Sequence, residues 1–248
     1  MGREQGIDWR SRVAALGVHA YTAVGALTAM LALQAGLAGE VRRAFVWLAI
    51  AVVIDSTDGT LARRVNVKNV VPWLDGARMD DIVDYLTYVF VPSVLIYEWG
   101  LLPEPGGWLI AACPLVASAY GFSRTDAKTA DHFFTGFPSY WNVVALYMYA
   151  AGSPPWLNAA ALLVLSFLVF VPIRYLYPSR TPTLRGLTCT LGVIWGGMLG
   201  VIIWQLPHAS PSLLLASAFY PAYYLALSLY LGARRSGRPA AGMEAGAA

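Results

Sequence analysis

Long apolar runs, interrupted by short polar segments, make up most of the chain. A helix that crosses a bilayer needs about 20 mostly apolar residues, and eight runs reach or approach that length. They cover residues 17–37, 44–63, 82–102, 108–123, 138–152, 156–176, 187–206 and 212–232. The pattern therefore predicts an all-α fold, a polytopic integral membrane protein with about eight transmembrane helices.

The polar segments between the runs are short, and several are rich in proline and glycine, as turns are. Examples are residues 102–107, 152–155 and 207–211. Because no long linker separates the runs, we expect a single transmembrane domain over residues 1–235. The small and polar residues 236–248 predict a disordered C-terminal tail.

Composition supports a membrane protein and excludes other classes. Apolar residues make up 58% of the chain and charged residues 12%, whereas soluble domains carry about 25% charged residues. This excess of apolar residues excludes a disordered chain and argues against a water-soluble enzyme. The net charge of +3 is too small to indicate a nucleic-acid partner.

The distribution of lysine and arginine predicts the orientation in the membrane, because cytoplasmic loops carry an excess of these residues. With the N-terminus in the cytoplasm, fifteen of the 17 basic residues face the cytoplasm, and only Arg42 and Arg43 face outward. We therefore expect an even number of spans with both termini cytoplasmic.

Aspartates are concentrated at the cytoplasmic ends of the second and third predicted spans. Six of the 14 acidic residues lie between positions 55 and 84. Asp55 and Asp58 are three residues apart, and Asp80 and Asp84 are four apart, so each pair shares one helical face. Asp81 lies about 100° away around the same helix.

These carboxylates need a partner, because one charge in a membrane helix costs about 2.5–3.5 kcal/mol on the insertion scale. Protonation or bound divalent cations would remove that cost, and oxygen-only ligands suit Mg²⁺, Mn²⁺ or Ca²⁺. The alternative is a solvated loop in which the acids pair with Arg63, Arg64 and Arg78.

Small residues lie beside the aspartates. Gly59, Ala62 and Gly76 allow a ligand to approach the backbone closely, and Arg63 offers a planar fork to phosphate oxygens. Metal ligands, small residues and one arginine at the membrane edge together indicate a site for a diphosphate.

The spacing of these residues resembles the motif of the CDP-alcohol phosphotransferase family, D-x2-D-G-x2-A-R-x(n)-G-x3-D-x3-D. All eight fixed positions are filled between Asp55 and Asp84. The resemblance implies two divalent ions, Mn²⁺ or Mg²⁺, on Asp55, Asp58, Asp80 and Asp84. It also implies Asp84 as the catalytic base for the acceptor hydroxyl. Residues implied at the nucleotide and diphosphate are Gly59, Ala62, Arg63, Gly76 and, in the first span, Thr22.

A wider similarity connects the chain to the bacterial phosphatidylcholine synthase family. It rests on the twelve-residue spacer in the motif and on the tracts 85–92, 133–142 and 172–178. This resemblance implies transfer of a phosphatidyl group from CDP-diacylglycerol to choline, with release of CMP. It further implies a homodimer surrounded by membrane lipids in the bacterial inner membrane, with the active site facing the cytoplasm.

Choline is a permanent cation, so a site for it needs aromatic faces, an acid, or both. Five of the nine residues 133–141 are aromatic. An interfacial aromatic belt, which membrane proteins commonly carry, is the alternative explanation of this tract. The candidates for acceptor binding are Tyr85, Tyr88, Tyr140 and Trp141. Serine, inositol or glycerol phosphate stay open as acceptors, with basic candidates at Arg124, Lys128 and Arg174.

Two other functional classes compete with a phosphotransferase. An ion-coupled transporter would use the aspartates as a relay, but near the middle of the bilayer. A membrane prenyltransferase would place its two acidic motifs in different halves of the chain, whereas here thirty residues contain all of them.

Overall fold

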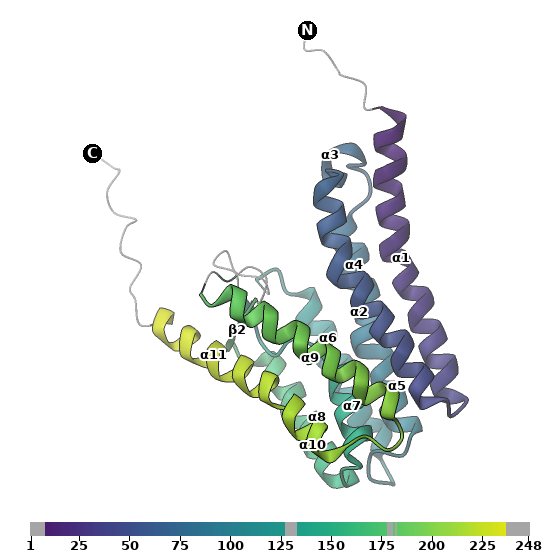
Figure 1. Cartoon of the computed structure of the whole chain (residues 1–248), viewed down its shortest axis with the longest axis vertical. Helices are drawn as coiled ribbons and strands as arrows, with labels where there is room; N and C mark the ends of the chain where they lie inside the picture. Colours follow the sequence, from purple (N-terminus) through teal and green to yellow (C-terminus); the bar gives the residue numbers. More distant parts are fainter. Residues whose placement is uncertain (1–7, 127–132, 178–180, 182, 237–248) are drawn as a thin grey trace.

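The computed structural model describes residues 8–126, 133–177, 181 and 183–236 of the chain. Helices form most of the described part (Figure 1). Of the predicted disordered tail, only Ser236 is described, as the last residue of a helix. The rest of that tail and Lys128 lie outside the described residues.

Two long helices form the N-terminal hairpin, α1 (Trp9–Leu37) and α2 (Val41–Arg64). Gly39 has a φ of +78° in the turn between them, a left-handed conformation that glycine adopts without strain. Small residues are buried along both helices, among them Ala29 and Ala32 in α1 and Ala44 in α2. Because the buried residues of α1 are mostly alanine, glycine and threonine, its backbone can lie close to a neighbouring helix.

Asp80 and Asp84 belong to a helical stretch that runs from Gly76 to Glu98 without a break. A short helix α3 (Val67–Val70) precedes it. The stretch consists of α4 (Gly76–Asp84), a π-helical segment η1 (Tyr85–Phe90) and α5 (Val91–Glu98). The span was predicted at 82–102. The helical stretch begins six residues before the predicted start and ends four residues before the predicted end.

The middle of the chain contains three shorter helices and a two-stranded ribbon. The helices are α6 (Gly107–Ser123), α7 (Trp141–Ala151) and α8 (Pro155–Phe170). Strands β1 (Phe133–Thr135) and β2 (Arg174–Leu176) pair antiparallel, with Phe134 opposite Tyr175. The tyrosine is buried, and removal from water raises the pKa of Tyr175.

The described part is mostly helical, as predicted, and this ribbon is its only sheet. The span predicted at 156–176 is wrong in its last six residues. Pro172 lies two residues after the end of α8, directly after the C-cap Val171, and a proline has no N–H to continue the helical hydrogen bonds. The backbone after it turns into β2 instead. In addition, α7 begins at Trp141, three residues after the predicted start at 138.

The C-terminal part consists of α9 (Arg185–Gln205), α10 (Pro211–Ser217) and α11 (Phe219–Ser236). Helices α10 and α11 occupy the last predicted span and are separated at Ala218. Pro221 cannot donate to the carbonyl of Ser217 four residues earlier, which explains the irregular turn there.

Within the described residues, four helical segments are long and apolar enough to cross a membrane: Trp9–Leu37, Val41–Arg64, Arg185–Gln205 and Pro211–Gly232. Large apolar side chains point outward from them. In α9, for example, Val193 is 77% exposed and Trp204 is 76% exposed. Small residues inside and large apolar residues outside are typical of helices that face lipid.

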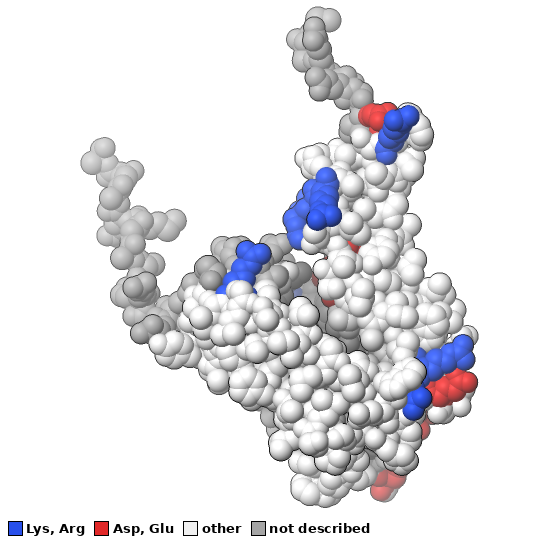
Figure 2. All heavy atoms as spheres, in the orientation of Figure 1, with Lys and Arg blue, Asp and Glu red and all other residues white. Residues whose placement is uncertain are grey.

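The helices form two arms (Figure 1). Helices α1, α2 and α4 make one arm, and α9 with α11 makes the other. Figure 2 shows a hollow between the arms, with acidic side chains visible inside it and basic side chains at the ends of both arms.

Candidate metal centre and active site

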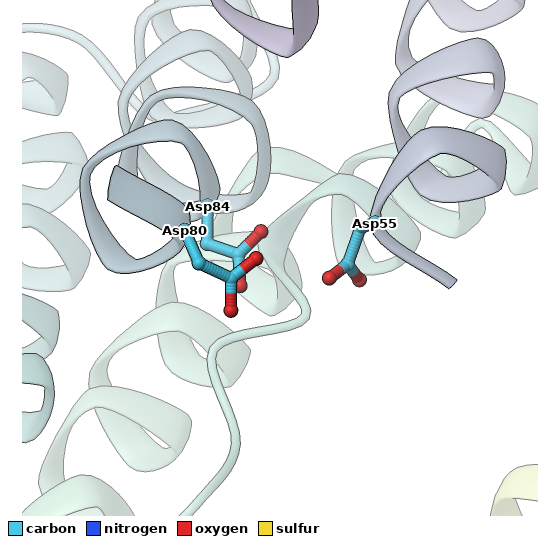
Figure 3. A group of neighbouring side chains, drawn as sticks. All are labelled: Asp55, Asp80 and Asp84. Atoms are coloured by element: carbon cyan, nitrogen blue, oxygen red, sulfur yellow. The ribbon is translucent and has the colours of Figure 1, made fainter. Parts of the chain in front are cut away.

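Three aspartates from the motif converge in the structure. Asp55 lies in α2, while Asp80 and Asp84 lie one turn apart in α4. One carboxylate oxygen from each can be chosen so that all three lie within 4.8 Å of one another. Figure 3 shows Asp80 and Asp84 extending side by side from one helix toward Asp55 on the other. This arrangement of oxygen ligands could hold a hard divalent cation.

Asp58 lies beside this group but is not one of its three members. Its side chain is buried, with 6% of its surface exposed. Its Oδ2 accepts a hydrogen bond of 2.7 Å from the Thr22 hydroxyl of α1. All four aspartates and Thr22 line one small cavity of about 10 Å³, close to the space that a single water molecule needs.

A tyrosine hydroxyl donates a hydrogen bond to the carboxylate of Asp55. The Tyr88 hydroxyl in η1 donates a 2.7 Å hydrogen bond to Oδ2 of Asp55. Only 8% of Tyr88 is exposed, and its ring lies 6.3 Å from that of Tyr140 in an edge-on arrangement. The sequence indicated Tyr88 as a candidate for the acceptor, whereas its hydroxyl is already engaged by a candidate metal ligand.

Two glycines set the positions of α1 and α4. A Cβ added to Gly25 would overlap Val83, which lies directly before Asp84. A Cβ on Gly76 would lie 2.8 Å from Cε1 of His19. At the start of α4, Asp75 accepts hydrogen bonds from the backbone N–H groups of residues 77 and 78. This is N-capping, which fixes the first turn of a helix.

The residues expected to bind the nucleotide lie in three different helices, α1, α2 and α4. Arg63 is exposed near the end of α2, and its Nη2 donates a 2.9 Å hydrogen bond to the Thr60 hydroxyl. Its Nη1 lies 3.4 Å from the position of a Cβ on Gly59, and Ala62 is partly buried beside it. Thr22 binds Asp58, and Gly76 packs against His19. Of these five nucleotide candidates, Thr22 alone is among the residues that line the small cavity of the aspartates.

The other aromatic candidates differ in their access to the site. Tyr140 is 39% exposed. Trp141 is completely buried, and its Nε1 donates to the Ser118 hydroxyl at 2.8 Å, so its ring is part of the core. Tyr85 donates to the backbone carbonyl of Leu115 at 2.9 Å.

The basic residues considered for other acceptors also have fixed places. Arg124 donates hydrogen bonds of 2.8 and 2.7 Å to the two carboxylate oxygens of Asp126. This contact holds the pKa of Asp126 below its usual value. Arg174 begins β2.

The sequence did not predict the tertiary contacts of Thr22, Tyr88 and His19. Nothing in the spacing indicated that Thr22 and Tyr88 donate to Asp58 and Asp55, or that His19 covers Gly76. The hydroxyls approach from other segments of the chain, so a linear motif does not encode these contacts.

Comparison with known proteins extends the similarity over nearly the whole chain. The chain is 38% identical to phosphatidylcholine synthase of Pseudomonas aeruginosa over 224 residues, which cover 90% of this chain and 94% of that protein. The chain belongs to the phosphatidylcholine synthase family. The enzyme of that name from Legionella bozemanae is 42% identical over 193 residues, 75% of this chain and 89% of the other. The Legionella pneumophila enzyme is 38% identical over 224 residues, 88% of each chain.

No protein-family model matches the chain. The similarity to phosphatidylcholine synthases extends far beyond the thirty residues of the acidic motif. It therefore includes the helices that surround the carboxylates.

Proposed function

We propose that the chain is a phosphatidylcholine synthase, which transfers the phosphatidyl group of CDP-diacylglycerol to choline and releases CMP. The convergence of Asp55, Asp80 and Asp84 within 4.8 Å is the observation that carries the proposal. The relatives that bear this name match 75–90% of the chain. They favour choline over serine, inositol or glycerol phosphate as the acceptor.

The donor set fits a divalent metal, because it consists of carboxylate oxygens, which are the ligands that Mg²⁺ and Mn²⁺ prefer. Asp55, Asp80 and Asp84 would hold one ion. A second ion would need Asp58, which keeps one carboxylate oxygen when Oδ2 accepts from Thr22. Bound divalent ions would supply positive charge to the diphosphate and to the leaving CMP.

In the proposed reaction, Asp84 accepts the hydroxyl proton of choline. The choline oxygen then forms a bond to the β-phosphorus of CDP-diacylglycerol, and the bond between that phosphorus and the oxygen of CMP breaks. Arg63, Gly59, Ala62 and Gly76 lie in the neighbouring turns, and we assign the CDP half of the donor to them. Thr22 contributes by orienting Asp58.

Choline binding is assigned to aromatic faces near the carboxylates. Tyr140 fits this role best, because the residue is partly exposed and its ring lies beside that of Tyr88. The negative face of an aromatic ring attracts a quaternary ammonium group, which serine and inositol do not carry.

We further propose about eight spans in one domain of residues 1–235, with both termini and the active site on the cytoplasmic side of the bacterial inner membrane. The distribution of arginine and lysine supports this orientation. A homodimer is the expected assembly.

Release of CMP from CDP-diacylglycerol by the purified protein tests the function. We expect release with choline and little with serine, inositol or glycerol phosphate. Asp84→Asn should abolish turnover while the donor still binds. Glu98→Gln, at the other end of the same helical stretch, is the matched control and should turn over normally. The proposal fails if CMP appears with none of these alcohols, or if Asp84→Asn works at a near-normal rate.

A further inference from the structure

A second hollow lies on another side of α4 and does not share any lining residue with the cavity of the aspartates. It is an open groove of about 600 Å³ between α4, the start of η1 and the end of α6. Its lining includes Arg78, Asp81, Ile82, Tyr85 and Phe122. Asp81 is about 100° around the helix from Asp80, which explains why one residue faces the groove and its neighbour faces the metal centre.

The groove has a charged part and an apolar part. Arg78 and Asp81 supply one charge of each sign, and the side chain of neither takes part in a hydrogen bond or ion pair recorded for the described part of the chain. Asp75, which also lines the groove, is engaged as the N-cap of α4. Ile82 is 58% exposed, and Leu86 lies one turn further along the helix.

Two aromatic rings in the groove have fixed positions. The rings of Tyr85 and Phe122 meet edge to face, with centroids 6.0 Å apart. The Tyr85 hydroxyl donates to the carbonyl of Leu115, which anchors the ring. A positioned aromatic ring beside a carboxylate is a favourable surface for a quaternary ammonium group.

From this charge pattern we infer that the groove binds a zwitterionic phospholipid with a phosphocholine headgroup. Arg78 pairs with the phosphate, Asp81 and the aromatic rings contact the trimethylammonium group, and Ile82 and Leu86 contact the acyl chains. An anionic lipid fits less well, because Asp75 and Asp81 would lie close to its headgroup and repel it. The inference rests on the residues of the groove and goes beyond the proposed transfer reaction.

Native mass spectrometry of the purified protein in detergent tests this site. The probes are dioctanoyl-phosphatidylcholine and dioctanoyl-phosphatidylglycerol, with excess CDP-diacylglycerol present to occupy the catalytic site. We expect one phosphatidylcholine per chain, held about tenfold more tightly than phosphatidylglycerol. Arg78→Ala should weaken its binding about tenfold, and Asp81→Asn should remove the preference between the two lipids. Lys68→Ala, an exposed cation on α3, is the matched control and should bind both lipids as the unaltered protein does.

A second variant tests the groove without changing its charges. Ile82→Trp adds bulk to the wall of the groove, so it should reduce phosphatidylcholine binding while the thermal unfolding temperature stays close to that of the unaltered protein. Equal retention of both lipids by the unaltered protein would overturn the inference. So would unchanged retention in Arg78→Ala and Ile82→Trp. Because CMP release is not the readout, failure of this site would leave the proposed transfer reaction intact.

Discussion

Replacing Tyr88 with phenylalanine tests how the candidate metal ligand Asp55 is oriented. The change removes the hydroxyl that donates to Asp55 at 2.7 Å and leaves a ring of nearly the same shape. Tyr88 is 8% exposed, so a water molecule cannot readily replace the lost donor. Asp55 would then lose one of the contacts that set its orientation.

The size of the effect follows from the contact. A hydrogen bond to a charged group contributes about 1.5–3 kcal/mol, and loss of a group that orients a metal ligand typically costs about 10–100-fold in metal affinity or activity. Because the other contacts of Asp55 remain, we expect the lower part of this range, about tenfold. The metal concentration for half-maximal activity should therefore rise about tenfold in Tyr88→Phe.

The assay is CMP release by purified protein, titrated with Mg²⁺ and separately with Mn²⁺. Tyr224→Phe is the matched control, because the Tyr224 hydroxyl also lies inside the protein but donates to the backbone carbonyl of Leu176 at 3.0 Å. The control should lose some thermal stability and keep its metal dependence. The reasoning is refuted if Tyr88→Phe needs no more metal than the unaltered enzyme, or if both variants shift equally.

Three further changes test other parts of the site. Gly25→Ala forces Val83 and α4 away from α1, so it should destabilise the protein by about 1–3 kcal/mol and lower turnover. Gly17→Ala, with open space around its Cβ, should do neither in thermal unfolding and CMP-release assays. Thr22→Val removes the donor to Asp58 and should lower activity about tenfold at an almost unchanged KM for choline; normal activity would contradict the assigned contact. Chelation with EDTA should abolish CMP release, and Mg²⁺ or Mn²⁺ should restore it; activity that survives exhaustive chelation would exclude the metal role.

The apolar pattern predicted the helices well because each run had to satisfy its own backbone hydrogen bonds. It failed where proline removed a donor. The end of α8 before Pro172 and the division between α10 and α11 before Pro221 both follow from that local rule. The pairing of β1 with β2 could not be predicted, because the two strands are separated by α7 and α8 in the sequence.

The candidate site was predictable only as far as helical spacing determines it. Spacing alone placed Asp80 and Asp84 on one face, and the motif brought Asp55 to them. The aromatic tract 133–141 predicted the acceptor site less well than the spacing predicted the acidic cluster, because composition does not show which side chains are buried. Trp141 was a candidate for choline on that basis, yet it lies in the core and donates to Ser118.

The contacts around Asp55 and Asp58 explain how these carboxylates can be oriented for a ligand. Asp55 and Asp58 lie on one helix, and each accepts a 2.7 Å hydrogen bond from a hydroxyl of another segment. One donor comes from α1 and the other from the π-helical segment next to Asp84. Each hydroxyl binds Oδ2 of its aspartate, so the contact orients that side chain relative to the segment that supplies the hydroxyl. Wider helical turns are often found at functional sites. Here the π-helical segment begins directly after Asp84 and contains Tyr88, which donates to Asp55.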